Sequence, residues 1–198
     1  HTCTIKHYIK NFSISSPEFK EIDGIAYTRN GNKLVACSAG KEHVVVPDGV
    51  KTIGKYAFAN CHIKSLILPD SVTTIGAYAF EECKDLESVV LGGNIEIIAE
   101  NAFESCKKLT SIVIPPSVYS IGDYAFLHSG LEDIRLNEGL QHIGAMAFSG
   151  TKIKSLQLPA SIVYLKTECI DDTMMEVIMP SFKKDVCKGF IKTFRPFL

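Results

Sequence analysis

The chain has 198 residues, of which 46% are hydrophobic, and its 21 basic and 22 acidic side chains leave a formal net charge of −1. This composition provides enough apolar surface for a sizeable core and excludes an intrinsically disordered chain. The charges are spread along the sequence, so nothing predicts binding to nucleic acid or to a membrane surface. No apolar run approaches the roughly 20 residues that span a bilayer. Because the chain starts at His1 rather than Met, we expect a piece of a longer product.

Residues 1–42 are predicted to form an N-terminal cap. Two apolar runs, 25–27 and 34–36, flank the sequence Arg29-Asn30-Gly31-Asn32. An Asn-Gly pair between two strand-like runs is a strong signal for a β-hairpin, because both residues tolerate a positive φ. We therefore expect a hairpin at the start of a single domain that comprises residues 1–198.

Residues 43–180 contain an internal repeat of 22 or 23 residues. An Ala-Phe pair recurs once in each repeat, and an isoleucine precedes each phenylalanine by five positions; the phenylalanines are Phe58, Phe80, Phe103, Phe126 and Phe148. The second half of each repeat has the pattern L-x-x-L-x-L, as in Leu86-Val89-Leu91, and its alternation predicts a short strand. One coil cannot enclose its own apolar face, whereas stacked coils bury a shared core.

The repeat therefore predicts a leucine-rich-repeat solenoid of about six to seven repeats. We expect a right-handed, mostly β superhelix with a parallel sheet on its concave face and little α-helix. Short extended or 3₁₀ segments, such as Ser71 to Phe80, are expected on the convex face. Adjacent coils should place equivalent residues above one another at the strand spacing of about 4.8 Å.

Residues 181–198 are predicted to form a C-terminal capping helix. Phe182, Val186, Phe190 and Phe194 recur every four residues behind Ser181, which is a suitable N-cap. The stretch 182–195 carries five Lys or Arg residues and one Asp. Two interpretations remain: the helix closes the end of the core with its basic face in water, or it docks an acidic partner.

The sequence from Pro69 to Leu86, PDSVTTIGAYAFEECKDL, resembles the consensus unit of the BspA-like leucine-rich repeats. The stretch from Asp23 to Lys41 is similar to a variant unit of the same family, and the resemblance covers roughly residues 18–180. The chain departs from the pattern at Cys169, where phenylalanine would fall, and at Leu165-Lys166, where Ile-Gly would fall. The resemblance implies a secreted or cell-surface protein associated with adhesion to host matrix proteins, host cells or other microbes.

The cysteines follow the repeat. Cys61, Cys83 and Cys106 occupy one column of the repeat, and the next two coils have Ser129 and Thr151 there. A column that accepts Cys, Ser or Thr indicates small buried side chains rather than disulfides or a redox centre.

The sequence offers no pattern for chemistry. The six histidines lack metal-ligand spacing, and neither a phosphate loop nor a dinucleotide fingerprint occurs. His128, Ser129 and Asp123 lie within one coil, but no activated-serine signature surrounds them. We therefore expect no metal, no cofactor and no enzymatic activity.

The outward positions of the predicted strands are the candidate binding residues. Alternation places Leu66 and Leu68 inside, so residues 65 and 67 and their equivalents point away from the core. We expect the partner-binding residues to be Val45, Ser65, Ile67, Ser88, Val90, Ser111, Val113, Asp133, Arg135 and Gln157. Exposed aliphatic residues beside small polar ones often mark an interaction site, although β-branched residues are also simply good strand formers.

Two hypotheses of function follow. The first is a non-enzymatic adhesion module, outside the cell or on its surface, that binds a protein or glycan, including host-derived partners, through its concave face. The second is a spacer or stalk within a larger surface protein, with binding carried by other domains. The sequence predicts no nucleic-acid partner and no membrane insertion, and it leaves the oligomeric state open.

Overall fold

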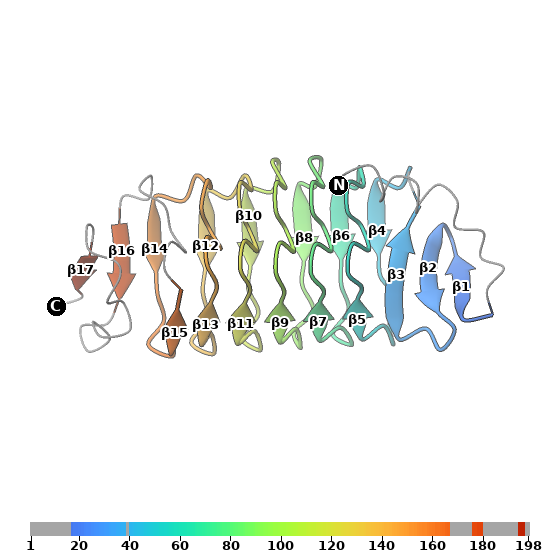
Figure 1. Ribbon diagram of the computed structural model, residues 1–198, viewed down its shortest axis with the longest axis horizontal. Coiled ribbons are helices and arrows are strands. Elements are labelled where there is room, and N and C mark those ends of the chain that lie inside the picture. The colour runs from blue at the N-terminus through green and yellow to red at the C-terminus, as the bar shows by residue number, and fades with distance from the viewer. Residues whose placement is uncertain (1–16, 39, 167–175, 180–193, 197–198) are drawn as a thin grey trace.

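The computed structural model describes residues 17–38, 40–166, 176–179 and 194–196. Its coils stack along the long axis of the molecule, and most coils contribute one short strand to each of two faces (Figure 1). The described residues contain no helix. The mostly β, parallel solenoid expected of a leucine-rich-repeat protein is confirmed.

The first face is formed by the strands with the L-x-x-L-x-L pattern. These are β4 (His43–Val45), β6 (Ser65–Ile67), β8 (Ser88–Val90), β10 (Ser111–Val113), β12 (Asp133–Arg135), β14 (Ser155–Gln157) and β16 (Glu176–Met179). The strands pair in parallel, and the pairing is continuous within the groups β4-β6-β8, β10-β12 and β14-β16. We call this side of the molecule the β4–β16 face.

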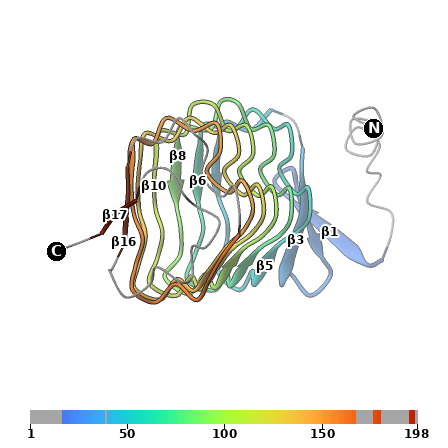
Figure 2. The same cartoon turned by 60° about the vertical axis from the view of Figure 1, so that its left-hand side comes forward.

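The second face is a longer sheet made of shorter strands. These are β5 (Thr52–Ile53), β7 (Thr74–Ile75), β9 (Ile97–Ile98), β11 (Ser120–Ile121), β13 (His142–Ile143) and β15 (Tyr164–Leu165). They pair in parallel in an unbroken series, and we call this side the β5–β15 face. Figure 2 shows the two faces on opposite sides of the coils. The segment Ser71 to Phe80 therefore includes a paired strand, where the sequence predicted only an extended or 3₁₀ segment.

The N-terminal end of the β5–β15 face continues into an antiparallel cap. Strands β1 (Phe19–Ile22), β2 (Ile25–Thr28) and β3 (Lys33–Cys37) form it, and β3 pairs in parallel with β5. The turn between β2 and β3 contains Gly31 with a φ of 76°. The hairpin predicted at Asn30-Gly31 is confirmed.

The C-terminal helix predicted over 181–198 lies largely outside the described residues. Its described part, β17 (Phe194–Pro196), is a strand that pairs in parallel with β16. For these three residues the prediction of a helix was wrong. The four-residue spacing of the aromatic residues is only a local signal, whereas the strand depends on hydrogen bonds to a partner strand distant in the sequence.

The core is organised in columns that run through the coils. The five repeated phenylalanines are buried and stacked, with ring centroids 5.0, 4.9, 5.3 and 5.7 Å apart. The alanine before each phenylalanine is also fully buried. The repeat is thus a packing unit in which each coil is covered by its neighbours.

The cysteine column behaves as the sequence predicted. Cys61, Cys83 and Cys106 are buried free thiols, as is Cys37 in the cap. Cys83 and Cys106 donate to the carbonyl oxygens of Phe58 and Phe80 in the preceding coil, at 3.0 and 3.2 Å. Burial raises the pKa of the Cys83 thiol to about 12, so this thiol is protonated and unreactive near neutral pH.

Candidate binding surface

The outward side chains of the β4–β16 face include four exposed aliphatic residues. The exposed fractions are 68% for Val45, 45% for Ile67, 57% for Val90 and 76% for Val113. The residue before each of them points inward, and at Val44, Leu66 and Ile112 it is buried. We call Val45, Ile67, Val90 and Val113 the aliphatic strip. The outward orientation that the sequence predicted for these residues is confirmed.

Strand register aligns most of the strip. Val45 lies opposite Ile67 and Ile67 opposite Val90, so three side chains follow one another in neighbouring strands. The hydrogen-bonded ladder is interrupted between β8 and β10, and Val113 continues the series on the next coil. Three strand spacings make the strip about 14 Å long, and side chains at this spacing leave no room for a layer of water between them.

The predicted polar residues lie beside and beyond the strip. Ser65 and Ser88 face each other across β6 and β8, and the ring of His43 hydrogen-bonds the Ser65 hydroxyl at 2.8 Å. Ser111 lies opposite Asp133, and Val113 opposite Arg135. The structure thus brings the strip together with the half-buried Ser65, with the exposed Ser88 and Ser111, and with the charged pair.

The two outermost predicted residues are more distant from the strip. Ser155 and Gln157 lie in β14, where they face Glu176 and Ile178 of β16. A second interruption of the ladder separates β12 from β14. Gln157 is exposed but belongs to a different stretch of the face.

Ion pairs between coils border the strip at the N-terminal ends of its strands. Lys64 contacts Glu42 at 2.8 Å, and Asp85 contacts Lys108 at 2.9 Å and His62 at 2.8 Å. Hydrogen bonds from Lys108 and His62 lower the pKa of Asp85 to about 2, so this carboxylate stays ionised over the physiological range. Because these charges are paired with one another, the border of the strip is polar without a strong net field.

The histidine, serine and aspartate noted in one coil do not form a catalytic group. The Asp123 carboxylate contacts Lys166 at 2.6 Å and accepts a hydrogen bond from the Ala145 N–H at 2.9 Å. Partial burial opposes ionisation of Asp123, but these two hydrogen bonds hold its pKa below the ordinary value. Ser129 is 3% exposed, and its hydroxyl has no hydrogen-bond partner.

Neither a metal-binding group nor a membrane-spanning helix was found in the part of the chain that the structure describes. There, no three His, Cys, Asp or Glu side chains gather so that they could hold an ion. Likewise, no described helix is long and apolar enough to cross a bilayer.

Sequence reasoning missed a groove along the turns that lead from the β4–β16 face into the β5–β15 face. It has a volume of about 580 Å³, and the residues that line it include Lys51, Asp70, Asn94, Glu96 and Tyr119. Lys51, Glu96 and Tyr119 each stand two residues before a repeated isoleucine, so this column of the repeat contained a signal. The signal is weak because the residue type changes in every coil.

The family model of the BspA type leucine-rich repeat region matches residues 51–176, in six copies. The chain belongs to this family. Its members are repeat proteins, so the solenoid and the repeat columns described above are family features. No curated protein is significantly similar to the chain in sequence.

Solved structures of bacterial leucine-rich-repeat proteins are similar to the fold. A leucine-rich-repeat protein of T. pallidum has a TM-score of 0.69 and 24% identity, over 90% of this chain and 95% of its own. The pneumococcal vaccine antigen PcpA has a TM-score of 0.74 and 20% identity, over 91% and 47%. A leucine-rich cell surface protein of Faecalibacterium prausnitzii has a TM-score of 0.61 and 25% identity, over 88% and 42%. The chain thus spans less than half the length of the latter two proteins.

Proposed function

We propose that the protein is a non-enzymatic recognition module, outside the cell or on its surface, that binds a protein partner through the aliphatic strip. The observation that carries the proposal is a series of four exposed β-branched side chains on four consecutive coils, three of them in register across paired strands. Burying such side chains against an apolar partner surface releases about 25 cal/mol for each Å² removed from water.

A protein surface fits the strip better than a glycan does. The four side chains offer no hydrogen-bonding group, whereas sugar hydroxyls lose water on binding and need donors and acceptors in exchange. Ser65 and Ser88 beside the strip supply a polar border of the kind that surrounds the apolar centre of protein interfaces. The extracellular location rests on the family and on the similarity to the cell surface protein of F. prausnitzii.

A second candidate function is a spacer in a longer surface protein. The observation that favours it is the length of PcpA and of the F. prausnitzii protein, of which this chain covers 47% and 42%. In that case the solenoid positions other domains, and the strip has no partner of its own.

The test measures binding of the 198-residue chain to a panel of purified host matrix and serum proteins by surface plasmon resonance. The double variant Ile67→Asp, Val90→Asp places two charges within the strip and should weaken binding to any panel protein at least tenfold, since an unpaired charge is costly to bury. The control is Val163→Asp, an equally exposed aliphatic position (61%) just before β15 on the other face, which should bind like the wild type.

Circular dichroism and the melting temperature of each variant report whether the fold is intact. Binding that survives the double substitution would eliminate the strip as the site. A wild-type chain that binds no panel protein would favour the spacer.

A further inference from the structure

The groove on the β5–β15 side has a floor of regularly stacked side chains. Lys51, Thr73, Glu96 and Tyr119 occupy the same position in four consecutive coils. Their backbones form one ladder, in which Thr73 donates to Lys51, Glu96 to Thr73 and Tyr119 to Glu96, at 2.9, 2.8 and 3.0 Å. Three strand spacings separate Lys51 from Tyr119, so the floor is about 14 Å long.

The wall of the groove is built from the turns that enter the β5–β15 face, and its polar side chains are held in place. The Asp70 carboxylate accepts a hydrogen bond from the Gly93 N–H at 2.6 Å through Oδ1. The Asn94 side-chain amide donates to the Asp70 carbonyl at 3.0 Å. The Asp70 carboxylate therefore keeps its second oxygen, Oδ2, for a ligand, and the Asn94 amide keeps its oxygen, Oδ1.

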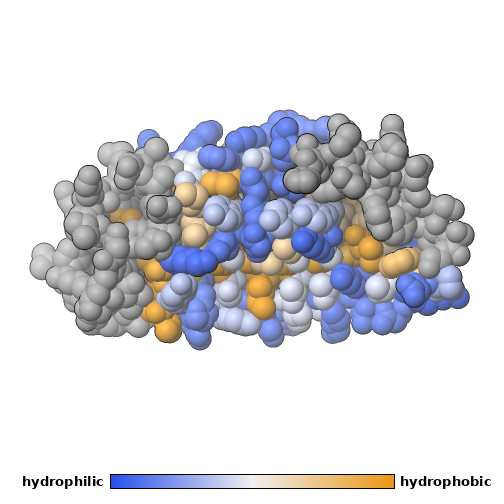
Figure 3. Space-filling view, viewed as in Figure 1, coloured by the Kyte–Doolittle hydropathy of each residue, from blue (hydrophilic) through white to orange (hydrophobic). Residues whose placement is uncertain are grey.

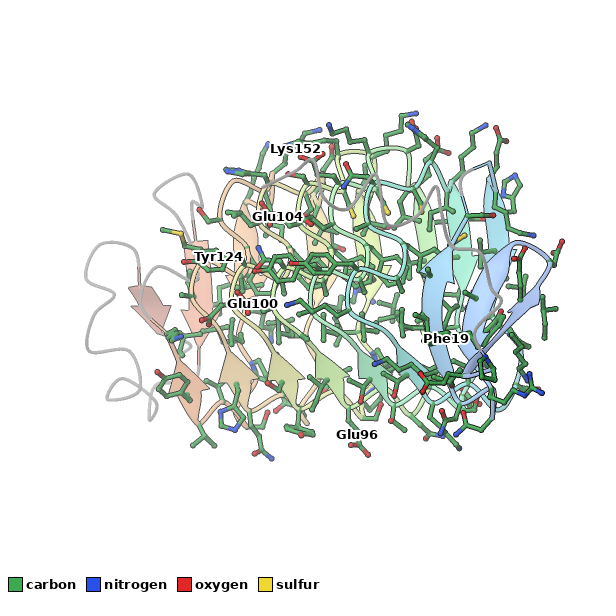
Figure 4. The ribbon with its side chains drawn as sticks, turned by 45° about the vertical axis from the view of Figure 1, so that its right-hand side comes forward. Phe19, Glu96, Glu100, Glu104, Tyr124 and Lys152 are labelled. Carbon is green, nitrogen blue, oxygen red and sulfur yellow. The ribbon has the colours of Figure 1, made fainter. Side chains whose placement is uncertain are left out.

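The side chains of the floor present polar groups and one aromatic ring to a ligand. Among the described residues, Glu96 and Lys51 form no ion pair, and Glu96 points away from the body of the solenoid in Figure 4. The Tyr119 side chain, 38% exposed, forms one end of the groove. The groove thus combines hydrogen-bond acceptors, the Lys51 ammonium group and, at one end, the aromatic ring of Tyr119.

We propose that this groove binds a short neutral or amine-bearing oligosaccharide, with one sugar ring against Tyr119 and its hydroxyls hydrogen-bonded to Asp70, Asn94 and Glu96. Hydroxyl groups both donate and accept, and charge-assisted hydrogen bonds to carboxylates are the stronger kind. The apolar face of a sugar ring packs on an aromatic ring, which supplies the contact area.

The chemistry of the groove disfavours other ligands. Two carboxylates against one ammonium group repel phosphate, nucleic acid and sulfated glycans. The backbone groups of the floor are already used between coils, so a peptide cannot add as a strand. Tyr119 is the one large apolar side chain in the lining, which leaves no set of pockets for the side chains of a peptide.

The proposed sugar site is separate from the proposed protein site, because none of the four strip residues lines the groove. The experiment applies the 198-residue chain to an array of neutral, amine-bearing, sialylated and sulfated oligosaccharides and quantifies the hits by calorimetry. We expect hits among the neutral or amine-bearing sugars. Tyr119→Ser should then weaken binding about tenfold, and Glu96→Gln should weaken it severalfold.

The matched control is Tyr164→Ser, which removes an exposed tyrosine (51%) from β15, outside the groove. It should bind sugars like the wild type, as should the strip variant Ile67→Asp, Val90→Asp. Circular dichroism verifies the fold of every variant. The proposal is overturned if no oligosaccharide binds, if only sulfated or sialylated ones bind, or if Tyr119→Ser and Tyr164→Ser behave alike.

Discussion

The cysteine column of the repeat shows that a sulfur or an oxygen atom at the same buried position differs in its cost to stability. Cys61, Cys83 and Cys106 place a weakly polar thiol under a turn, and Thr151 at the end of the column donates to the Phe148 carbonyl at 2.8 Å. Ser129 occupies the same column with a buried hydroxyl that has no partner. A buried hydroxyl without a hydrogen bond costs about 1–3 kcal/mol, whereas a thiol in the same place loses far less on leaving water.

Ser129→Cys should therefore stabilise the protein by about 1 kcal/mol. The column already accommodates sulfur in three coils, so we expect no steric penalty. Cys106→Ser serves as the control and should change stability less, because its hydroxyl would keep the Phe80 carbonyl as a hydrogen-bond acceptor. Urea denaturation followed by circular dichroism measures both, with an unchanged m-value as the sign of unchanged unfolding. A less stable Ser129→Cys would mean that packing, not the unsatisfied hydroxyl, dominates at this position.

At the scale of the element, close approach between coils explains the glycine that follows four of the six strands of the β5–β15 face. A Cβ at Gly76 would lie 2.7 Å from the Ile53 carbonyl oxygen and 3.0 Å from the Lys55 nitrogen. Both neighbours are backbone atoms, so neither can rotate away. The Ile-Gly pair of the repeat thus reflects contact between successive coils, not a need for an unusual φ.

Gly76→Ala should destabilise the protein by about 1–2 kcal/mol, through overpacking between two coils. Ala99 occupies the equivalent position in the next coil, so a methyl group is compatible with the fold and the variant should still be native. The control is Gly93→Ala, whose Cβ would meet only a side-chain oxygen at 3.4 Å and should change stability little. Thermal denaturation of both variants measures the difference. Equal melting temperatures would show that the coils can move apart without cost.

The elements that could be predicted from the sequence are those whose pattern is complete within one short stretch of residues. Alternation in Leu86-Val89-Leu91 placed β8 and its outward Val90, and Asn30-Gly31 placed the hairpin. Strand β7 has two residues, too few to show alternation, and exists because Thr74 and Ile75 pair with neighbouring coils. The groove follows from stacking of unlike residues in different coils, which no local pattern encodes. The groove depends on where the fold places Asp70 and Asn94 relative to the floor, and a segment of sequence does not contain that placement.

At the scale of the whole molecule, each coil packs mainly against its two neighbours, so stability is close to a sum of coils and interfaces. The phenylalanine column illustrates this arrangement. Phe103 stacks on Phe80 and on Phe126, with centroid distances of 4.9 and 5.3 Å, whereas the described partner of Phe148 is Phe126 at 5.7 Å. The face seen in Figure 3 is largely hydrophilic with small hydrophobic groups, as expected when this column and the other inward columns bury most of the apolar side chains.

Phe103→Ala should therefore do more than lower stability. Loss of the buried ring costs about 3–5 kcal/mol and opens a cavity between two coils, which weakens the coupling of the two halves of the array. Hydrogen exchange followed by mass spectrometry should show lost protection in the coils on both sides of the cavity, in β8 and β12. Phe148→Ala is the matched control, and its loss should be confined to the coils from β12 onward. If both variants lose protection uniformly along the described coils, the solenoid unfolds as one cooperative unit, and the nearest-neighbour description does not apply to it.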